Sequence, residues 1–325
     1  MFKLRFRMKV GQFIGFVLLT IMSAMGSASG QVTLFEDLLY WHTSQQSSSP
    51  WAYQQTNNRP PGAVYTEPNA YFRWSPGGRI GILYTPQSFF DTKLYWTYFS
   101  TKALESITAP PGQFFVPEFF NGFTTANLYN SAQLDWRLIM NMFDAEVGHA
   151  FQPIDTLTVR PFIGVKGGTI NQSIHSDWQA TLLNIQLYSA KENLKNNFWG
   201  IGPSVGIDTI FSLFKNVTLQ SDFSTALLWG HWDVQDVYKG PGPLLSFIPQ
   251  TTIRTNTKNA MLGSFMARYF LGLAYTYQAK ATVIIKAGYE MQFWSNQLRL
   301  PMFQALPVHG DLTLQGGTCG ILIKL

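Results

Sequence analysis

The sequence predicts an all-β fold, an antiparallel transmembrane β-barrel with ten strands, short periplasmic turns and long extracellular loops. Three observations predict it. Apolar and polar residues alternate in repeated segments, the connections between these segments alternate in length, and the chain opens with a segment typical of exported proteins. A period of two is that of a β-strand, because successive side chains point to opposite faces of a sheet.

The alternation is clearest over residues 282–294, TVIIKAGYEMQFW. One face carries Val283, Ile285, Ala287, Tyr289, Met291 and Phe293, and the other carries Thr282, Ile284, Lys286, Gly288, Glu290, Gln292 and Trp294. At about 13 residues the segment exceeds the usual strand of five or six. A tilted strand needs about 9–11 residues to cross a bilayer. The pattern predicts a spanning strand, apolar toward lipid and polar toward a lumen.

Nine further segments show a similar period, which gives ten predicted strands. They cover residues 32–43, 71–85, 93–102, 132–147, 157–166, 199–208, 218–229, 264–277, 282–294 and 312–325. The count stays open between ten and 16, because residues 113–123 and 181–189 could form further strands. In the segment 132–147 the alternation changes phase near Phe143 and Asp144, which predicts a β-bulge.

The predicted connections alternate between short turns and long loops. The turns cover residues 86–91, 152–156, 212–216 and 278–281, and the loops cover residues 44–70, 103–129, 171–197, 233–259 and 295–311. This regular alternation is typical of outer-membrane barrels, whose periplasmic turns are short and whose extracellular loops are long.

Residues 1–30 are interpreted as a cleaved secretory signal, and residues 31–325 as the barrel domain. The first segment has a basic start, an apolar stretch and small residues before Gln31. An uncleaved anchor helix is the alternative. No later apolar run has the length of a membrane helix, so we expect insertion as a closed barrel.

The net charge of +5 does not indicate a nucleic-acid partner. The signal segment alone carries Lys3, Arg5, Arg7 and Lys9. Without them the chain is nearly neutral and contains no basic run, so it lacks the electrostatic footprint of a phosphate-binding protein.

A single cysteine, Cys319, excludes an internal disulfide. Two interpretations remain open: a small residue that faces lipid, or a thiol that forms an intermolecular disulfide with another chain. It cannot form a structural zinc site by itself.

Two His-x-Asp pairs are the only candidates for catalysis, His175 with Asp177 and His231 with Asp233. Neither is accompanied by a Gly-x-Ser-x-Gly nucleophile motif, and the five histidines show no metal-ligand spacing. We therefore expect no enzyme, no cofactor and no metal.

The charges on the polar faces are the predicted selectivity elements of the lumen. They are Arg79, Lys93, Asp135, Arg137, Arg160, Lys166, Asp208, Asp222, Arg268, Lys286, Glu290 and Lys324. Because eight are basic, they predict a pore with weak anion preference. The alternative is that they pair with one another inside a plugged barrel. Eight strands give a filled interior and 16–18 an aqueous channel, so ten would be narrow.

Seven segments resemble the major outer membrane proteins of Legionella and of environmental chlamydiae. They are DLLYWHTSQ (37–45), LDWRLIMNMFDAEVGHAF (134–151), LTVRPFIGVKGGTINQS (157–173), NFWGIGPSVGIDT (197–209), LLWGHW (227–232), AGYEMQFW (287–294) and GDLTLQGGTCGILIKL (310–325). The resemblance implies a porin-like barrel in the outer membrane of a Gram-negative-type bacterium. It also implies contact with outer-membrane lipid, insertion by the barrel-assembly machinery, and homo-oligomers or cross-linked envelope proteins.

The predicted function is passive, porin-like diffusion of small polar solutes. The alternative is a structural or adhesin-type surface protein with a plugged or narrow barrel, which would expose loop aromatics such as Trp51, Tyr53 and Trp178. A soluble periplasmic β-protein is a third interpretation, and it would have to bury every apolar strand face in a core.

Overall fold

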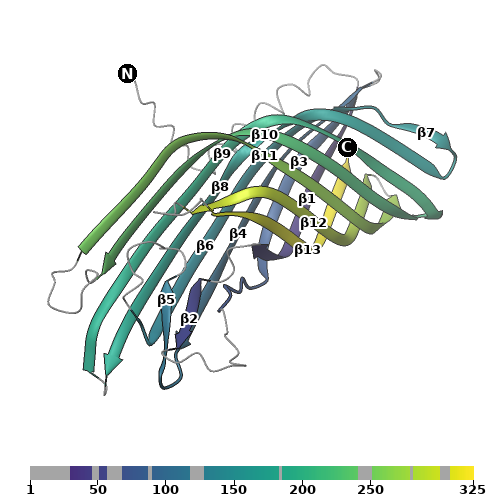
Figure 1. Ribbon diagram of the computed structural model, residues 1–325. Coiled ribbons are helices and arrows are strands. Elements are labelled where there is room, and N and C mark those ends of the chain that lie inside the picture. Colours follow the sequence, from purple (N-terminus) through teal and green to yellow (C-terminus); the bar gives the residue numbers. More distant parts are fainter. Residues whose placement is uncertain are drawn as a thin grey trace.

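A computed structural model of the chain describes residues 30–45, 51–56, 68–86, 90–117, 128–182, 185–240, 251–278, 281–300 and 308–325. These residues form β-strands joined by short connections (Figure 1). In the described part, no helix is long and apolar enough to cross a membrane. The predicted signal segment lies outside the described residues.

Ten strands form one closed antiparallel barrel, as the sequence predicts. In sheet order they run β6, β4, β3, β1, β13, β12, β11, β10, β9 and β8, and pairing of β6 with β8 closes the circle. Their bounds are β1 (Gly30–Gln45), β3 (Ser75–Pro86), β4 (Asp91–Thr108), β6 (Ser131–Gly148), β8 (Leu157–Leu182), β9 (Ile185–Phe214), β10 (Val217–Gly240), β11 (Thr251–Gln278), β12 (Thr282–Leu300) and β13 (Val308–Lys324). The short β7 (Phe151–Ile154) pairs only with β8.

The wall of the barrel is much taller on one side. Strands β8 to β11 hold 26, 30, 24 and 28 residues, whereas β3 holds 12. About 9–11 residues cross a bilayer, so these four strands continue far beyond it on the side of the long connections. The predicted loops 171–197 and 233–259 are wrong in large part, because most of their residues extend β8–β9 and β10–β11 (Figure 1).

The environment of the wall explains this error. At membrane level, outward side chains such as Ile163 and Val205 are apolar and exposed. Farther along the same strands the outward residues are polar, such as His175, while inward residues such as Trp178 and Leu194 are buried. The hydrophobic alternation therefore reverses where the wall leaves the lipid and its outer face meets water.

The predicted bulge in β6 is wrong, and the same reversal explains why the sequence indicated one. Strand β6 pairs with β4 and with β8 without any shift of register. Leu134, Trp136 and Met140 point inward in its extracellular half, and Phe143 and Val147 point outward in its membrane half. The phase of the hydrophobicity changes, but the strand does not.

A small ribbon inside the extracellular half closes much of that space. It pairs β2 (Ala52–Thr56) with β5 (Gln113–Pro117). The ring of Trp51 lies 5.4 Å from that of the inward-facing Trp178, and both are buried. These aromatics are therefore unavailable as exposed adhesin contacts, and the side chain of Tyr53 lies outside the described residues. Of the predicted extra strand at 113–123, residues 113–117 form β5, outside the barrel wall, and residues 118–123 lie outside the described residues.

The ribbon joins a continuous apolar cluster across the extracellular half of the lumen. Its largest members include side chains from six barrel strands, all less than 2 % exposed: Trp41, Phe99, Trp136, Phe198, Trp232 and Trp294. Rings of Trp41 and Phe99 lie 5.4 Å apart, and those of Phe198 and Trp232 4.5 Å apart. This half of the barrel is a packed core.

One acid interrupts the lipid-facing surface. Glu36 on β1 is exposed on the outward face, opposite Ile80 on β3 and Ile321 on β13. The adjacent Asp37 points inward and is buried. The structure thus settles which of the two acids faces lipid.

Glu36→Leu is expected to raise the free energy of unfolding by about 1–2 kcal/mol, because a carboxylate on the lipid face is costly. Urea titration of the barrel refolded in phospholipid vesicles measures this. Glu36→Gln, which keeps a polar group at the site, is the control and should give a smaller gain. A loss of stability in Glu36→Leu would show that Glu36 has a stabilising partner.

Candidate functional site: a charged layer inside the barrel

The structure places ten of the twelve predicted lumen charges on the inward face. They are Arg79, Lys93, Arg160, Lys166, Asp208, Asp222, Arg268, Lys286, Glu290 and Lys324. The assignment of Asp135 and Arg137 to the lumen is wrong. They lie on the outward face of β6, where the Arg137 side chain is 65 % exposed. They belong to the part of β6 that lies outside the membrane, where the polar face is the outer one. Whether the ten set selectivity stays a prediction.

At membrane level, four inward-facing acids of this layer were missed: Asp37, Asp91, Asp144 and Glu146. Asp37 was ambiguous beside Glu36, Asp91 was assigned to a turn, and the last two follow the apparent phase change in β6. With them, the described layer holds seven bases and seven acids. The predicted excess of bases in the lumen is therefore wrong.

One half of this layer is organised around Glu290, which is fully buried. Arg79 donates to both of its oxygens, with Nη2–Oε1 2.7 Å and Nη1–Oε2 3.0 Å, and Arg268 Nε lies 2.7 Å from Oε1. Arg79 also lies 3.2 Å from Asp37, which Lys286 approaches to 3.0 Å. Residues from β1, β3, β11 and β12 thus meet across the lumen.

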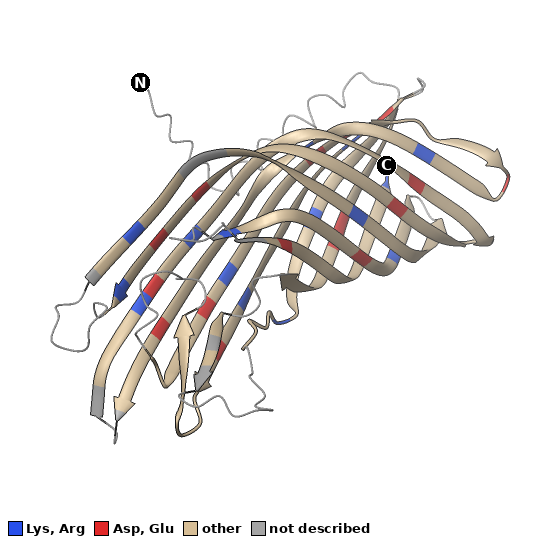
Figure 2. Ribbon diagram, viewed as in Figure 1, with Lys and Arg blue, Asp and Glu red and all other residues tan. Residues whose placement is uncertain are grey.

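The other half is organised around Arg160 on β8. Its guanidinium lies 2.6 Å from Asp91, 2.9 Å from Asp208 and 3.2 Å from Glu146. Lys93 lies 3.8 Å from Glu146 and 3.6 Å from Asp208. Separately, Lys166 pairs with Asp144. Figure 2 shows bases and acids on facing strands of the membrane-level wall.

Exposure within the layer falls from one end to the other. Side chains of Lys93 and Asp208, near the periplasmic turns, are 18 % and 17 % exposed, whereas those of Asp37 and Glu290 are at most 1 % exposed. Water therefore reaches the layer from the periplasmic end. Burying an ion pair carries a desolvation cost that apolar packing does not have. A layer that only filled the barrel would therefore be more stable if it were apolar.

A second set of acids lies in the extracellular extension, far above the membrane. Glu192 on β9 and Asp236 on β10 are inward-facing and at most 2 % exposed. Burial raises the pKa of Glu192 well above its usual range, and the nearby Asp236 carboxylate adds to this. Burial raises the pKa of Asp236 to about 7, although the backbone N–H of Val237 opposes the shift. Among the described residues, neither acid forms an ion pair.

These acids predict that stability falls as pH rises from about 4 to about 7. In that window the folded protein holds a proton on Asp236 that the unfolded chain, with a pKa near 3.9, has lost. Asp236→Asn should therefore raise the free energy of unfolding by about 2–4 kcal/mol at pH 8 and change it little at pH 4. Urea titrations at both pH values measure this.

The control for that experiment is Asp233→Asn, which removes an exposed acid from the outward face of the same strand. It should leave the pH dependence unchanged. An equal slope in wild type and Asp236→Asn would contradict the assignment.

Both His-x-Asp pairs lie on the outward face of the extracellular extension. His175 and Asp177 belong to β8, and His231 and Asp233 to β10. Among the described residues, no group of three or more His, Cys, Asp or Glu side chains could hold a metal ion.

Cys319 is a free, exposed thiol on the outward face of β13. Its register partners are Leu38 and Ala287, so it lies within the lipid-facing surface. Its cross-linking to another chain stays a prediction.

The model of the family described as "Legionella pneumophila major outer membrane protein precursor" matches residues 31–324. The chain belongs to this family. It is thus an outer-membrane β-barrel, which excludes the soluble periplasmic interpretation. No curated protein matches the chain.

Solved structures that are similar to the chain are outer-membrane barrels too. The outer membrane protease OmpT of Escherichia coli aligns at 9 % identity and a TM-score of 0.45, over 92 % of this chain and 99 % of that one. A FadL homologue of Pseudomonas aeruginosa (10 %, 0.27, 91 % and 90 %) and the toluene transporter TodX of P. putida (9 %, 0.29, 93 % and 91 %) are more distant.

Proposed function

We propose that this family member is a porin-like protein that is closed at rest. Small polar solutes would pass through the charged layer only when the apolar cluster above it moves aside. The observation that carries the proposal is the layer itself: ion pairs cross the lumen at membrane level, and its members Lys93 and Asp208, near the periplasmic turns, are partly exposed. Rings of side-chain charge are the elements that select ions in such pores.

The closure above the layer is partly made of a separate segment. The β2–β5 ribbon meets the wall by side-chain packing, such as that of Trp51 against Trp178. It is also bonded through its flanking chain: Phe115 pairs with Tyr129, whose hydroxyl lies 2.8 Å from that of Tyr238, and the carbonyl oxygen of Leu128 accepts from the Tyr188 hydroxyl at 2.6 Å. A segment held in this way can move without breaking the hydrogen bonds of the wall. This supports motion of the ribbon as the opening step.

The selectivity proposed for the open state is weak and without anion preference. Seven bases face seven acids in the described layer, so its formal charge is balanced. This replaces the anion preference expected from the sequence.

A second candidate is a permanently closed structural or surface protein. The observation that favours it is the extent of the apolar cluster, which contains six tryptophans among the described residues, including Trp51 and Trp178. A barrel of ten strands has room for little more than its own side chains.

Solute uptake by porin-deficient cells that express the chain distinguishes the two candidates. The rate of hydrolysis of a small zwitterionic β-lactam by a periplasmic β-lactamase reports its entry. The proposal expects a small increase for the wild type and a larger one for the double variant Trp51→Ala, Trp178→Ala. No increase in either strain, with heat-modifiable folded barrel present in the outer membrane, would favour the permanently closed protein.

A further inference from the structure

A row of three basic residues, with Ser173 between two of them, crosses the outward face of β4, β6, β8 and β9 outside the membrane. Lys102 lies opposite Arg137, Arg137 opposite Ser173, and Ser173 opposite Lys195. All four are exposed. Because neighbouring strands are about 4.8 Å apart, the row spans about 14 Å of the wall.

The cations of this row retain capacity for an external partner. Arg137 forms one exposed ion pair with Asp135 at 2.8 Å. No ion pair joins Lys102 or Lys195 to another described residue. Exposed pairs such as Arg137–Asp135 contribute little and are easily exchanged for a better acceptor.

Between the row and the lipid, the outward side chains change from polar to aromatic and then to apolar. The level next to the row holds the amides of Asn171 and Asn197, which lie opposite each other. The next holds Trp199, whose ring lies 5.8 Å from that of His231. These four residues help to line a hollow of about 250 Å³ on the outward face. Farther down, exposed Ile201 continues the apolar surface.

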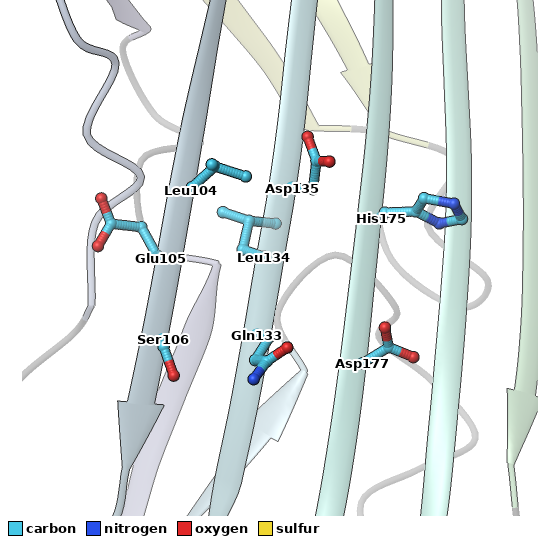
Figure 3. A pocket seen from close by; sticks show the side chains of 8 residues that line it. All are labelled: Leu104, Glu105, Ser106, Gln133, Leu134, Asp135, His175 and Asp177. Carbon is cyan, nitrogen blue, oxygen red and sulfur yellow. The ribbon is translucent and has the colours of Figure 1, made fainter.

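Above the row there is a second, larger hollow of about 430 Å³ between β4, β6 and β8 (Figure 3). Gln133, Asp135, His175 and Asp177 are among the polar side chains that line it. Amide, imidazole and carboxylate groups are donors and acceptors that suit sugar hydroxyls.

The vertical order of these groups identifies the ligand. The basic row lies four residues beyond the Trp199 level along each strand, or about 10 Å along the barrel axis for a strand tilted by about 40°. Aromatic rings mark the interface of the membrane, so a phospholipid would place its single phosphate well below the row. A lipid with a tall, sugar-containing and phosphorylated headgroup reaches the Trp199 level, the level of Asn171 and Asn197, and the basic row.

We propose that this face binds a phosphorylated glycolipid of the outer leaflet. Its acyl chains would lie along Ile201 and the surface below, its sugars against Asn171, Asn197 and Trp199, and its phosphates on the basic row. The site is on the outside of the barrel, so it is independent of whether the lumen opens.

The test uses the full barrel, refolded in detergent micelles and titrated with deep-rough lipopolysaccharide, with binding read by native mass spectrometry. The double variant Arg137→Gln, Lys195→Gln should bind about tenfold more weakly or worse, because each loses a charge-assisted contact to phosphate. The matched control, Arg73→Gln, Lys215→Gln, removes two exposed cations elsewhere and should stay within about twofold of wild type.

Two further probes fix the chemistry of the ligand. Enzymatically dephosphorylated lipopolysaccharide should bind the wild type as weakly as intact lipopolysaccharide binds the double variant, and phosphatidylglycerol should bind both proteins equally. The proposal is overturned if the control variant loses as much affinity as the test variant. It is equally overturned if dephosphorylated glycolipid binds the wild type undiminished, or if millimolar inorganic phosphate displaces the intact lipid completely.

Discussion

Glu290→Gln is expected to lower the free energy of unfolding by about 3–5 kcal/mol, the usual cost of breaking a buried ion pair. The fully buried carboxylate accepts from Arg79 and Arg268, each within 3.0 Å. Glutamine has nearly the same shape but no charge, so both guanidinium groups would lose their main counter-charge inside the barrel. Urea titration in phospholipid vesicles, followed by tryptophan fluorescence, measures the change.

The matched control is Asp135→Asn, which removes the acid of the exposed Asp135–Arg137 pair. An exposed pair is worth about 1 kcal/mol or less. The comparison therefore also tests which face of its strand each acid occupies, since the sequence analysis had placed both acids in the lumen. Similar losses from the two variants would contradict the assignment of inward and outward faces.

Trp136→Ala is expected to lower the free energy of unfolding by a similar amount, about 3–5 kcal/mol. The indole is fully buried in the extracellular half, with its ring 5.2 Å from that of Phe72. Its Nε1 donates to Gln172 Oε1 at 3.1 Å, so the change leaves both a cavity and an unpaired amide oxygen. The same urea titration measures the loss.

The control for this change is Trp229→Ala on the outward face of β10, where the indole is 58 % exposed. It removes the same side chain without opening a cavity in the core, and we expect less than half the loss. If Trp229→Ala were the more damaging change, the packed cluster inside the extracellular half would not be the stabilising core described here.

The sequence predicts the barrel well at membrane level and poorly beyond it, for a physical reason. Within the lipid, the outward face must be apolar, so the polar face identifies the lumen. Outside the lipid, the outward face is wet and the inward face packs on a core. Strand β6 crosses this boundary, which is why Asp135 and Arg137 were assigned to the wrong face and Asp144 and Glu146 were missed.

The same boundary hid the extensions of β8 to β11. Their outward residues, such as Ser173 and Gln235, are polar, so these segments were predicted to be loops. A search for alternation in either phase would have found them, because Ile174 and Trp178 on β8 keep the period of two. No such signal exists for the position of the β2–β5 ribbon, which depends on contacts between segments that are distant in the chain.

The most direct test of a porin-like barrel closed at rest is single-channel conductance in a planar bilayer. We predict that the folded wild type stays closed with rare openings. The variant Trp51→Ala, Trp178→Ala should open in stable steps with almost equal permeability to anions and cations, whereas Trp229→Ala should remain closed. A wild type that conducts steadily, or a folded ribbon variant that never conducts, would contradict the account.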